Sequence, residues 1–223
     1  MLKVSKYFIP ILLAFILLSG CQSNAIPDEA QLDVPIVLQY PELPRGCEVT
    51  SLAMLLQYNG IDVDKMELAV KIAHQPFEKN GVKGNMHKGF VGAMNTLDED
   101  GLGVYVEPIV DLAKKYVPNR KVKNITEESP ESLYKAVSKG YPVWVLINAR
   151  FKELTDDHFL TWVTDEGEMK VTYRQHSVVI TGYDKDNVFI NNPMESNKNI
   201  AINRVNFEKA WIQMGSQAMY IKN

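Results

Sequence analysis

The sequence predicts an α+β domain with a helical N-terminal half and a largely antiparallel sheet in its C-terminal half. Apolar residues recur at helical spacing up to about residue 140, and short β-prone runs separated by tight reversals follow. Without the leader described below, roughly 200 residues remain, enough for one domain with a substantial core. We therefore expect a single domain rather than two.

The first twenty residues have the pattern of a secretory signal. Lys3 and Lys6 precede the apolar run Tyr7–Leu18, which is too short for a membrane-spanning helix of ~20 residues. The small pair before Cys21 resembles the lipobox of bacterial lipoproteins, which implies a signal peptide over residues 1–20 and lipid on Cys21. An ordinary secreted protein cleaved nearby is the alternative. We expect a lipid-anchored protein on the extracytoplasmic face of the cell membrane.

Charge excludes some classes of partner. The formal net charge is −3 and becomes −5 when the two leader lysines are removed, so the chain has no basic footprint for nucleic acid. Anionic lipid is excluded as an electrostatic partner on the same ground. The lipid on Cys21 must therefore provide the membrane anchor.

The cysteines are informative because secreted domains usually pair them. With Cys21 lipidated, Cys47 stands alone. A free thiol outside the cell is either buried and inert or kept for its reactivity.

The expected elements follow in chain order from a polar tether over residues 21–34, with the domain spanning residues 35–223. Val34–Leu38 is a short β-prone run, and the two prolines of the next loop exclude helix. A helix then begins at Cys47 and stops at Asn59-Gly60.

A second helix is signalled by Asp64 and is expected to end at His74, and a glycine-rich loop follows over Asn80–Gly92. Its glycines make room for another backbone, so we expect this loop to border a substrate cleft with Phe90 as an apolar contact. The remaining helices are expected near Ile109–Tyr116 and from Pro130 to Gly140. The expected strands are Pro142–Ile147, Val171–Tyr173, Gln175–Tyr183, Val188–Ile190 and Ala218–Ile221, with a hairpin turn at residues 184–187.

Cys47 is a candidate nucleophile because of its place in the first turn of a helix. Unpaired backbone N–H groups and the helix dipole favour an anion there, which predicts a thiol pKa lowered toward neutrality. Gly46 directly before it would let a substrate backbone approach. The alternative is a small buried residue at a helix start.

Four histidines could act as its base. His74 is expected at a helix end and His158 in an exposed turn, so both have structural explanations, and nothing near His87 in the sequence orients its ring. His176 begins a strand, where alternation aligns it with Val178 and can hold the ring rigidly. A half-buried sheet histidine is the alternative.

A catalytic histidine also needs an acceptor for its second nitrogen. The next strand ends in Asn191-Asn192-Pro193, and antiparallel pairing through the hairpin puts Asn191 or Asn192 near the His176 end. Both asparagines remain candidates at this point.

These segments together carry a family resemblance. Gln39, the loop Leu43–Leu52, the strand His176–Tyr183 and the segment Val188–Pro193 resemble the bacteriocin-processing, double-glycine-type cysteine peptidases, with their stand-alone secreted relatives most similar. The resemblance extends from Val34 to the C-terminus and implies a papain-like fold.

The resemblance also implies roles for single residues. Cys47 becomes the nucleophile, His176 the general base, Asn192 the residue that orients the histidine, and Gln39 an oxyanion donor. Gln39 lies farther upstream of the cysteine than in the leader peptidases, and Asn192 replaces their usual aspartate. Asparagine still fixes the imidazole tautomer but supplies no negative charge.

The sequence therefore predicts a membrane-anchored thiol hydrolase that cleaves peptide bonds of a peptide or protein substrate, without metal or organic cofactor. It contains no His-Glu-x-x-His pair, and one mature cysteine cannot form a thiolate zinc cluster. Two rivals remain: an amidase or transferase using the same residues, and a degenerate binding lipoprotein of the same fold.

Overall fold

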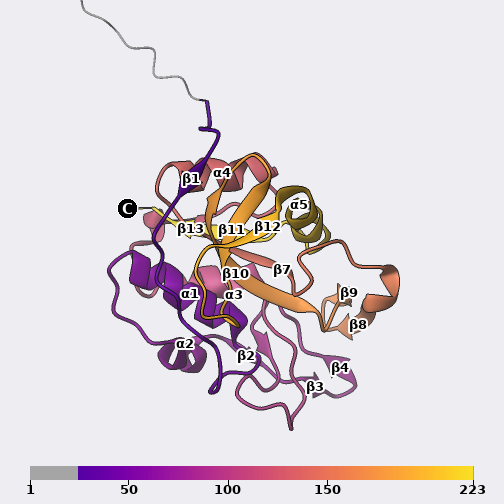
Figure 1. Cartoon of the computed structure of the whole chain (residues 1–223). Coiled ribbons are helices and arrows are strands. Elements are labelled where there is room, and N and C mark those ends of the chain that lie inside the picture. The colour runs from indigo at the N-terminus through magenta and orange to yellow at the C-terminus, as the bar shows by residue number, and fades with distance from the viewer. Residues whose placement is uncertain (1–24, 223) are drawn as a thin grey trace, which may run out of the picture.

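A computed structural model describes residues 25–222 of the chain (Figure 1). The predicted signal peptide and Cys21 lie outside the described residues. Within residues 25–222, none of the helices has the length and apolar character needed to cross a membrane.

One antiparallel sheet forms the centre of the molecule, with the strand order β12-β11-β10-β7-β13-β6. The short β1 (Ala30–Gln31) adds to β10 opposite Tyr183 and Gly182. The predicted tether therefore already joins the sheet, and the domain starts before residue 35. The other strands are β6 (Val122–Asn124), β7 (Val143–Asn148), β10 (Gln175–Tyr183), β11 (Asn187–Asn191), β12 (Ile200–Asn203) and β13 (Ala218–Ile221).

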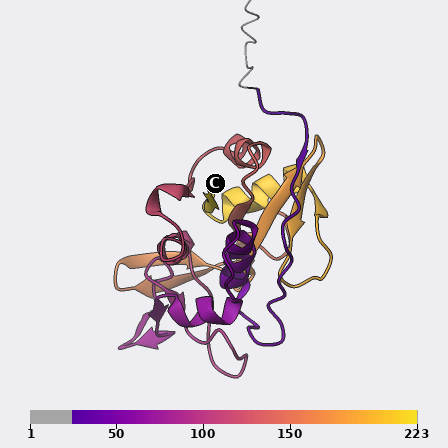
Figure 2. The ribbon, with the colours of Figure 1, turned by 90° about the vertical axis from the view of Figure 1, so that its left-hand side faces the viewer.

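Helices cover both faces of this sheet, as Figures 1 and 2 show. Strand alternation divides β7 between the two sides. Trp144 and Leu146 pack with the core around α1 and α3, whereas Val143, Val145 and Ile147 pack with the core around α4 and α5. The helices are α1 (Cys47–Tyr58), α2 (Lys65–Lys71), α3 (Val106–Ala113), α4 (Pro130–Ser138) and α5 (Arg204–Gln213).

The helix signals in the sequence act as expected. α1 begins at Cys47 and is followed by Gly60 at φ +76°, a left-handed conformation that favours glycine. Asp64 caps α2 by accepting a hydrogen bond from the Met66 N–H. All ten residues from 47 to 56 are buried, so α1 is a central helix rather than an amphipathic surface helix.

Three predictions of local structure are wrong. Val34–Leu38 forms no strand, although Val34 is buried. His74 does not end α2 but begins the two-residue strand β2 (His74–Gln75), which pairs in parallel with β5 (Phe90–Val91). The strand predicted over Val171–Tyr173 is instead β9 (Gly167–Val171), whose hairpin partner is β8 (Leu160–Thr164).

Two elements near the C-terminus, β12 and α5, were not predicted from the sequence. In α5 only Phe207, Ala210 and Trp211 are buried, a sparse apolar pattern that gives a weak helical signal. The small elements that complete the chain are β3 (Glu78–Lys79), β4 (Val82–Lys83) and the 3-10 helices η1 (Asn119–Lys121) and η2 (Asp156–His158).

Candidate active site

The candidate nucleophile lies where α1 meets the central sheet. Cys47 is the first residue of α1, and its side chain is 7% exposed. α1 packs against β10, and the backbone N–H of Ser177, directly after His176 on β10, acts to lower the pKa of the Cys47 thiol. The fold thus brings the helix start and the beginning of β10 together across about 130 residues of sequence.

The sulfur has an acidic partner that the sequence analysis did not identify. The Cys47 thiol donates a hydrogen bond to Glu48 Oε2, with the two atoms 3.2 Å apart. Within the described chain, no hydrogen bond joins this sulfur to His176. The thiol is therefore held by a carboxyl group rather than by the imidazole.

Glu48 is itself fixed by three further contacts. Its Oε1 accepts hydrogen bonds from the Gln175 amide at 2.9 Å and from the Val104 N–H at 3.2 Å. Its backbone carbonyl accepts one from the Trp144 indole at 3.0 Å. Gly103 makes room for this arrangement, because a Cβ there would lie 2.5 Å from Glu48 Oε1 and 2.2 Å from the Gln175 amide nitrogen.

The prediction of a lowered thiol pKa is wrong for this arrangement. Burial raises the pKa of the Cys47 thiol well above its usual value, and the negative charge and hydrogen bond of Glu48 raise it further. The backbone N–H groups of Cys47 and Ser177 oppose this shift but do not overcome it. Burial also raises the pKa of Glu48. The raised pKa favours the neutral thiol of Cys47 over the thiolate.

The candidate base already has its orienting partner. His176 Nε2 lies 2.8 Å from Asn192 Oδ1, and both residues are buried. The amide orientation of Asn192 is set by its other bonds, since Oδ1 also accepts from the Met194 N–H at 3.1 Å and Nδ2 donates to Glu195 Oε1 at 3.0 Å. Nε2 therefore carries the proton, and Nδ1 is left as an acceptor.

Burial makes this histidine a neutral one. Desolvation lowers the pKa of His176 to about 4, and the hydrogen bond to Asn192 only partly opposes it. Phe151 packs edge-on to the imidazole, with ring centroids 6.1 Å apart. Phe151 has φ +50°, an uncommon conformation for a residue with a side chain, and strain of this kind clusters at functional sites.

The choice between the two asparagines is settled by their contacts. Asn191 Nδ2 donates to the carbonyls of Val34 and Pro35, and Asn191 Oδ1 accepts from the Asn199 N–H at 3.0 Å. Asn191 therefore ties the N-terminal segment to the sheet, whereas Asn192 contacts His176.

Gln39 also reaches this region despite its distance in sequence from Cys47. Its N–H donates to the carbonyl of Pro193 at 2.8 Å, and its side-chain Nε2 donates to the carbonyl of Pro44 at 3.0 Å. The buried ammonium of Lys65 holds the Gln39 carbonyl at 3.1 Å. Gln39 thus bridges the loop before the nucleophile and the loop after the histidine partner.

The two predicted cleft residues have structural roles. Gly46 is buried, and a Cβ there would lie 2.5 Å from the Leu43 Cβ, so its small size is required for packing within the chain. The prediction that Phe90 contacts substrate is wrong, because its side chain is 0% exposed and belongs to the core. Gly84, Gly89 and Gly92 accommodate neighbouring backbone of this chain rather than of a substrate.

The other histidines lie apart from this cluster. His87 Nδ1 donates to Glu107 Oε1 at 2.9 Å, so its ring is oriented by a residue twenty positions away in the sequence. His74 Nε2 contacts the Ala69 carbonyl at 3.1 Å, and His158 lies in η2 beside Asp157. Among residues 25–222 there is no group of three or more His, Cys, Asp or Glu side chains that could hold a metal ion.

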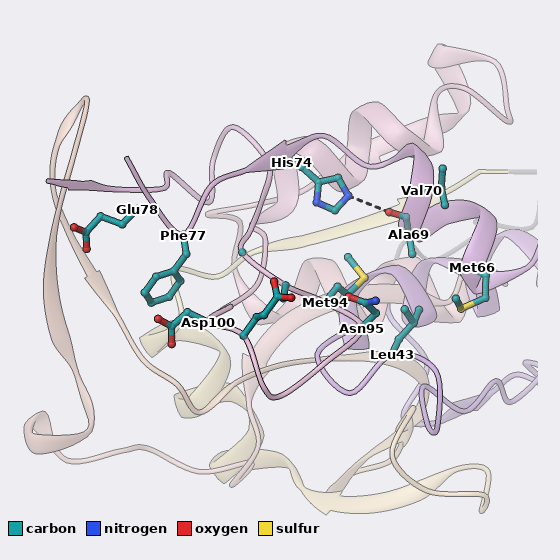
Figure 3. Close-up of a pocket in the computed structure, with 13 residues that line it drawn as sticks. Leu43, Met66, Ala69, Val70, His74, Phe77, Glu78, Met94, Asn95 and Asp100 are labelled. Atoms are coloured by element: carbon teal, nitrogen blue, oxygen red, sulfur yellow. Dashed lines mark hydrogen bonds between the residues drawn. The ribbon is translucent and has the colours of Figure 1, made fainter. Parts of the chain in front are cut away.

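A pocket of about 670 Å³ lies against the loop that precedes Cys47 (Figure 3). Figure 3 shows Leu43 and Met94 on one side of the pocket and Met66, Ala69 and Val70 of α2 nearby, with Phe77 and the acidic Glu78 and Asp100 toward the other end. Arg45 belongs to the loop that precedes Cys47, and its backbone N–H donates to the carbonyl of Met94, a pocket residue, at 3.1 Å. This hydrogen bond joins the loop to the pocket.

A comparison with protein families agrees with this geometry. The Peptidase_C39 like family matches residues 31–219. The chain belongs to this family. It is also 46% identical over 183 residues to YvpB of Bacillus subtilis (strain 168), an uncharacterized protein, with 82% of this chain and 71% of that protein covered.

Two solved structures have a similar fold. A crystal structure described as a candidate C39-like peptidase from Bacillus anthracis matches with a TM-score of 0.86 and 49% identity, covering 88% of this chain and 99% of that one. The peptidase domain of Streptococcus ComA, a bifunctional ABC transporter of a quorum-sensing pathway, matches with a TM-score of 0.50 and 17% identity, covering 86% and 100%. The second likeness shows the fold alone.

The predicted papain-like α+β fold is thus confirmed, and the predicted resemblance is confirmed at the level of the family. Family and fold support a thiol hydrolase of the peptidase type. The lipoprotein branch of the family stays a prediction.

Proposed function

We propose that this chain is a cysteine peptidase with Cys47 as nucleophile, His176 as general base and Asn192 as the residue that orients the base. The observation that carries the proposal is the buried His176–Asn192 hydrogen bond of 2.8 Å, because β10, which carries His176, packs against α1, which begins at Cys47. A nucleophile beside a base, with the base held by a third group, is the arrangement that acyl transfer requires.

The chemistry begins from neutral groups. The unprotonated His176 Nδ1 accepts the thiol proton as the sulfur bonds to the carbonyl carbon of the substrate, and the imidazolium then gives that proton to the leaving amine. Water, deprotonated by His176, hydrolyses the resulting thioester. With the pKa of His176 at about 4, the base is available throughout the neutral range, and activity falls as the pH decreases through that value.

Gln39 is proposed as a donor to the developing oxyanion, together with the backbone N–H of Cys47. One hydrogen of its amide is used by the Pro44 carbonyl, which fixes the amide beside the nucleophile loop and leaves the second hydrogen for substrate. Gln39→Ala is expected to reduce kcat by about 10²–10³-fold with a smaller effect on KM. An unchanged kcat would remove Gln39 from the mechanism.

The deciding experiment for the proposed function is cleavage of a peptide library by the purified protein, analysed by mass spectrometry. We expect new peptide termini with wild type and none with Cys47→Ala. Deamidated or acyl-transferred products in place of cleaved peptides would instead support an amidase or transferase.

We propose that the pocket of Figure 3 binds an apolar side chain of the peptide substrate that is followed by a basic residue. Its volume of about 670 Å³ lies within the range of ligand pockets, and its apolar lining comes from Leu43, Met66, Val70 and Met94. Glu99 and Asp100 line the same pocket, and the described chain supplies no salt bridge to either carboxylate. A Lys or Arg of the substrate would form a salt bridge with these carboxylates.

The membrane anchor remains part of the proposal, with Cys21 as the lipidated residue and the outer face of the membrane as the location. The small pair before Cys21 and the short apolar run support it. Cys21→Ser is expected to release the protein from membranes, and mass spectrometry of the wild type to find an acylated N-terminal peptide. Membrane retention of the variant without such a peptide in the wild type contradicts the anchor.

A binding protein of the same fold is the second candidate, favoured by one observation. The Cys47 thiol is buried and held by Glu48 rather than by His176. Such a protein would bind its peptide equally well as wild type and as Cys47→Ala. The wild-type protein would not cleave the peptide. Equilibrium binding combined with the cleavage assay separates this candidate from the peptidase.

A further inference from the structure

Glu48 is the one ionisable side chain that hydrogen-bonds the Cys47 sulfur within residues 25–222, and the mechanism above gives it no role. Its side chain is 1% exposed. A buried carboxyl group is costly unless it is hydrogen-bonded, so its retention next to the nucleophile requires an explanation. The contacts on its two oxygens supply one.

The two oxygens of Glu48 face different parts of the molecule. Oε1 is anchored to the scaffold by the Gln175 amide at 2.9 Å and by the Val104 N–H at 3.2 Å. Oε2 faces the sulfur at 3.2 Å. Gly103 leaves the space in which Glu48 and Gln175 meet. The carboxyl group is therefore held in place from behind and presents a single acceptor to the thiol.

The groups around this pair determine where the thiol proton resides. His176 lies at the start of β10 and is neutral, because burial lowers its pKa. The Tyr105 hydroxyl, on the segment that enters α3, donates to the Lys170 carbonyl rather than to Glu48. The described residues provide no lysine or arginine that hydrogen-bonds Glu48. A negative charge next to the sulfur with no compensating cation favours the protonated thiol over the thiolate.

We propose that Glu48 is a positioning residue that holds Cys47 as a protonated thiol in the resting protein and releases it to His176 when substrate enters. This proposal rests on the proposed peptidase function. In the productive step the hydrogen bond from the thiol to Glu48 Oε2 breaks, and the sulfur, still protonated, turns toward His176 Nδ1. The covalent S–H bond then breaks, and its proton passes to that nitrogen as the sulfur bonds to the carbonyl carbon of the substrate. Glu48 keeps the Gln175 and Val104 hydrogen bonds throughout and neither gains nor loses a proton.

A protected thiol has a chemical advantage outside the cell, because oxidation and alkylation proceed through the thiolate. Reactivity toward small reagents and reactivity toward substrate are then controlled separately. The first depends on Glu48, and the second on His176 and Asn192. This separation makes the proposal testable without knowledge of the natural substrate.

The test is the pH dependence of Cys47 alkylation by iodoacetamide, measured on the folded full-length protein with loss of free thiol as the readout. Glu48→Gln keeps the shape of the side chain and an oxygen for Gln175 and Val104 but removes the charge. We expect its alkylation at pH 8 to be at least about tenfold faster than that of wild type, since one pKa unit changes the thiolate fraction tenfold. Glu67→Gln, the same change on the exposed face of α2, should leave the wild-type profile intact.

His176→Ala is the second variant, and it tests the proposal even if Glu48→Gln does not fold. Because the resting sulfur is bonded to Glu48 and not to the imidazole, His176→Ala should abolish peptide cleavage and leave the midpoint of the alkylation profile unchanged. An increase of that midpoint means that a thiolate and imidazolium are paired at rest and overturns the proposal. An unaltered profile for folded Glu48→Gln overturns it as well. Failure of the peptidase function would appear instead as absence of cleavage by wild type, whatever the alkylation profiles.

Discussion

The sheet side and the helix side of the candidate site differ in how ready they are for catalysis. On the sheet side, His176 and Asn192 are already hydrogen-bonded, and the remaining oxygen and nitrogen bonds of Asn192 fix the tautomer. On the helix side, Cys47 is bonded to Glu48, and its pKa is raised by burial and by that charge. In the proposed mechanism the candidate base is thus already oriented in the resting protein, whereas the candidate nucleophile is hydrogen-bonded to another group. The comparison teaches that one site can combine a rigid half with a protected half.

The largest effect is expected from removing the nucleophile. Cys47→Ala should reduce the initial rate of peptide cleavage by on the order of 10⁴-fold or more, because no other group can form the acyl-enzyme. It should leave the His176–Asn192 hydrogen bond intact, so the loss of stability in acid that is attributed to His176 should remain. Cleavage assays and urea unfolding measure the two properties. Residual cleavage within tenfold of wild type would contradict the role of Cys47.

The buried neutral His176 should make the protein unstable to acid. Its folded pKa of about 4 lies below the ordinary value of 6.5, so the unfolded chain binds a proton more readily between these two values. The free energy of unfolding should therefore fall as the pH decreases from 6.5 to about 4, with a contribution of about 3 kcal/mol from this histidine.

This contribution is measured as the difference between wild type and His176→Ala in urea unfolding at pH 7 and at pH 4. The raised pKa of Glu48 acts in the opposite direction, since the folded chain then binds its proton more readily, but it is present in both proteins and largely cancels. His74→Ala, at an exposed position, is the control. Equal acid sensitivity of wild type and His176→Ala would show that the histidine is solvated.

The orienting role of Asn192 should be visible in kcat rather than KM. Asn192→Ala leaves the buried His176 Nε2–H without an acceptor and frees the ring to change tautomer, so we expect kcat to fall by about 10–100-fold. Asn191→Ala should lower stability instead, because its bonds hold Val34 and Pro35 to the sheet. If both variants lose only stability, the distinction between the two asparagines fails.

The smallest effect is expected at the pocket near the nucleophile loop. Asp100→Asn should raise KM by roughly three- to tenfold for peptides with a Lys or Arg beside the apolar residue, as expected for loss of a partly exposed ion pair of about 1 kcal/mol. Peptides with a neutral residue there should be unaffected and serve as the control. The effect should weaken at high salt. A KM change shared by both kinds of peptide would argue against charge recognition.

Local signals in the sequence were sufficient to predict those helices and strands that depend on a few neighbouring residues. The cap at Asp64, the glycines after α1 and α4, and the β-prone runs of β10 and β13 each predicted an element that the structure contains. β12 and α5 carried no comparable signal, because their apolar residues are few and their burial depends on contact with β11 and the core beyond it.

The sequence by itself determined the identities of the reactive groups: a solitary mature cysteine at a helix start, a histidine at a strand start and an asparagine pair after a hairpin. Tertiary structure decided which atoms meet. Glu48 reaches the sulfur, Asn192 rather than Asn191 reaches His176, and Phe90 is buried instead of lining a cleft. The physical reason is that ionisation and access depend on burial and on partners more than fifty residues away, such as Gln175 for Glu48, which periodicity and motif spacing do not encode.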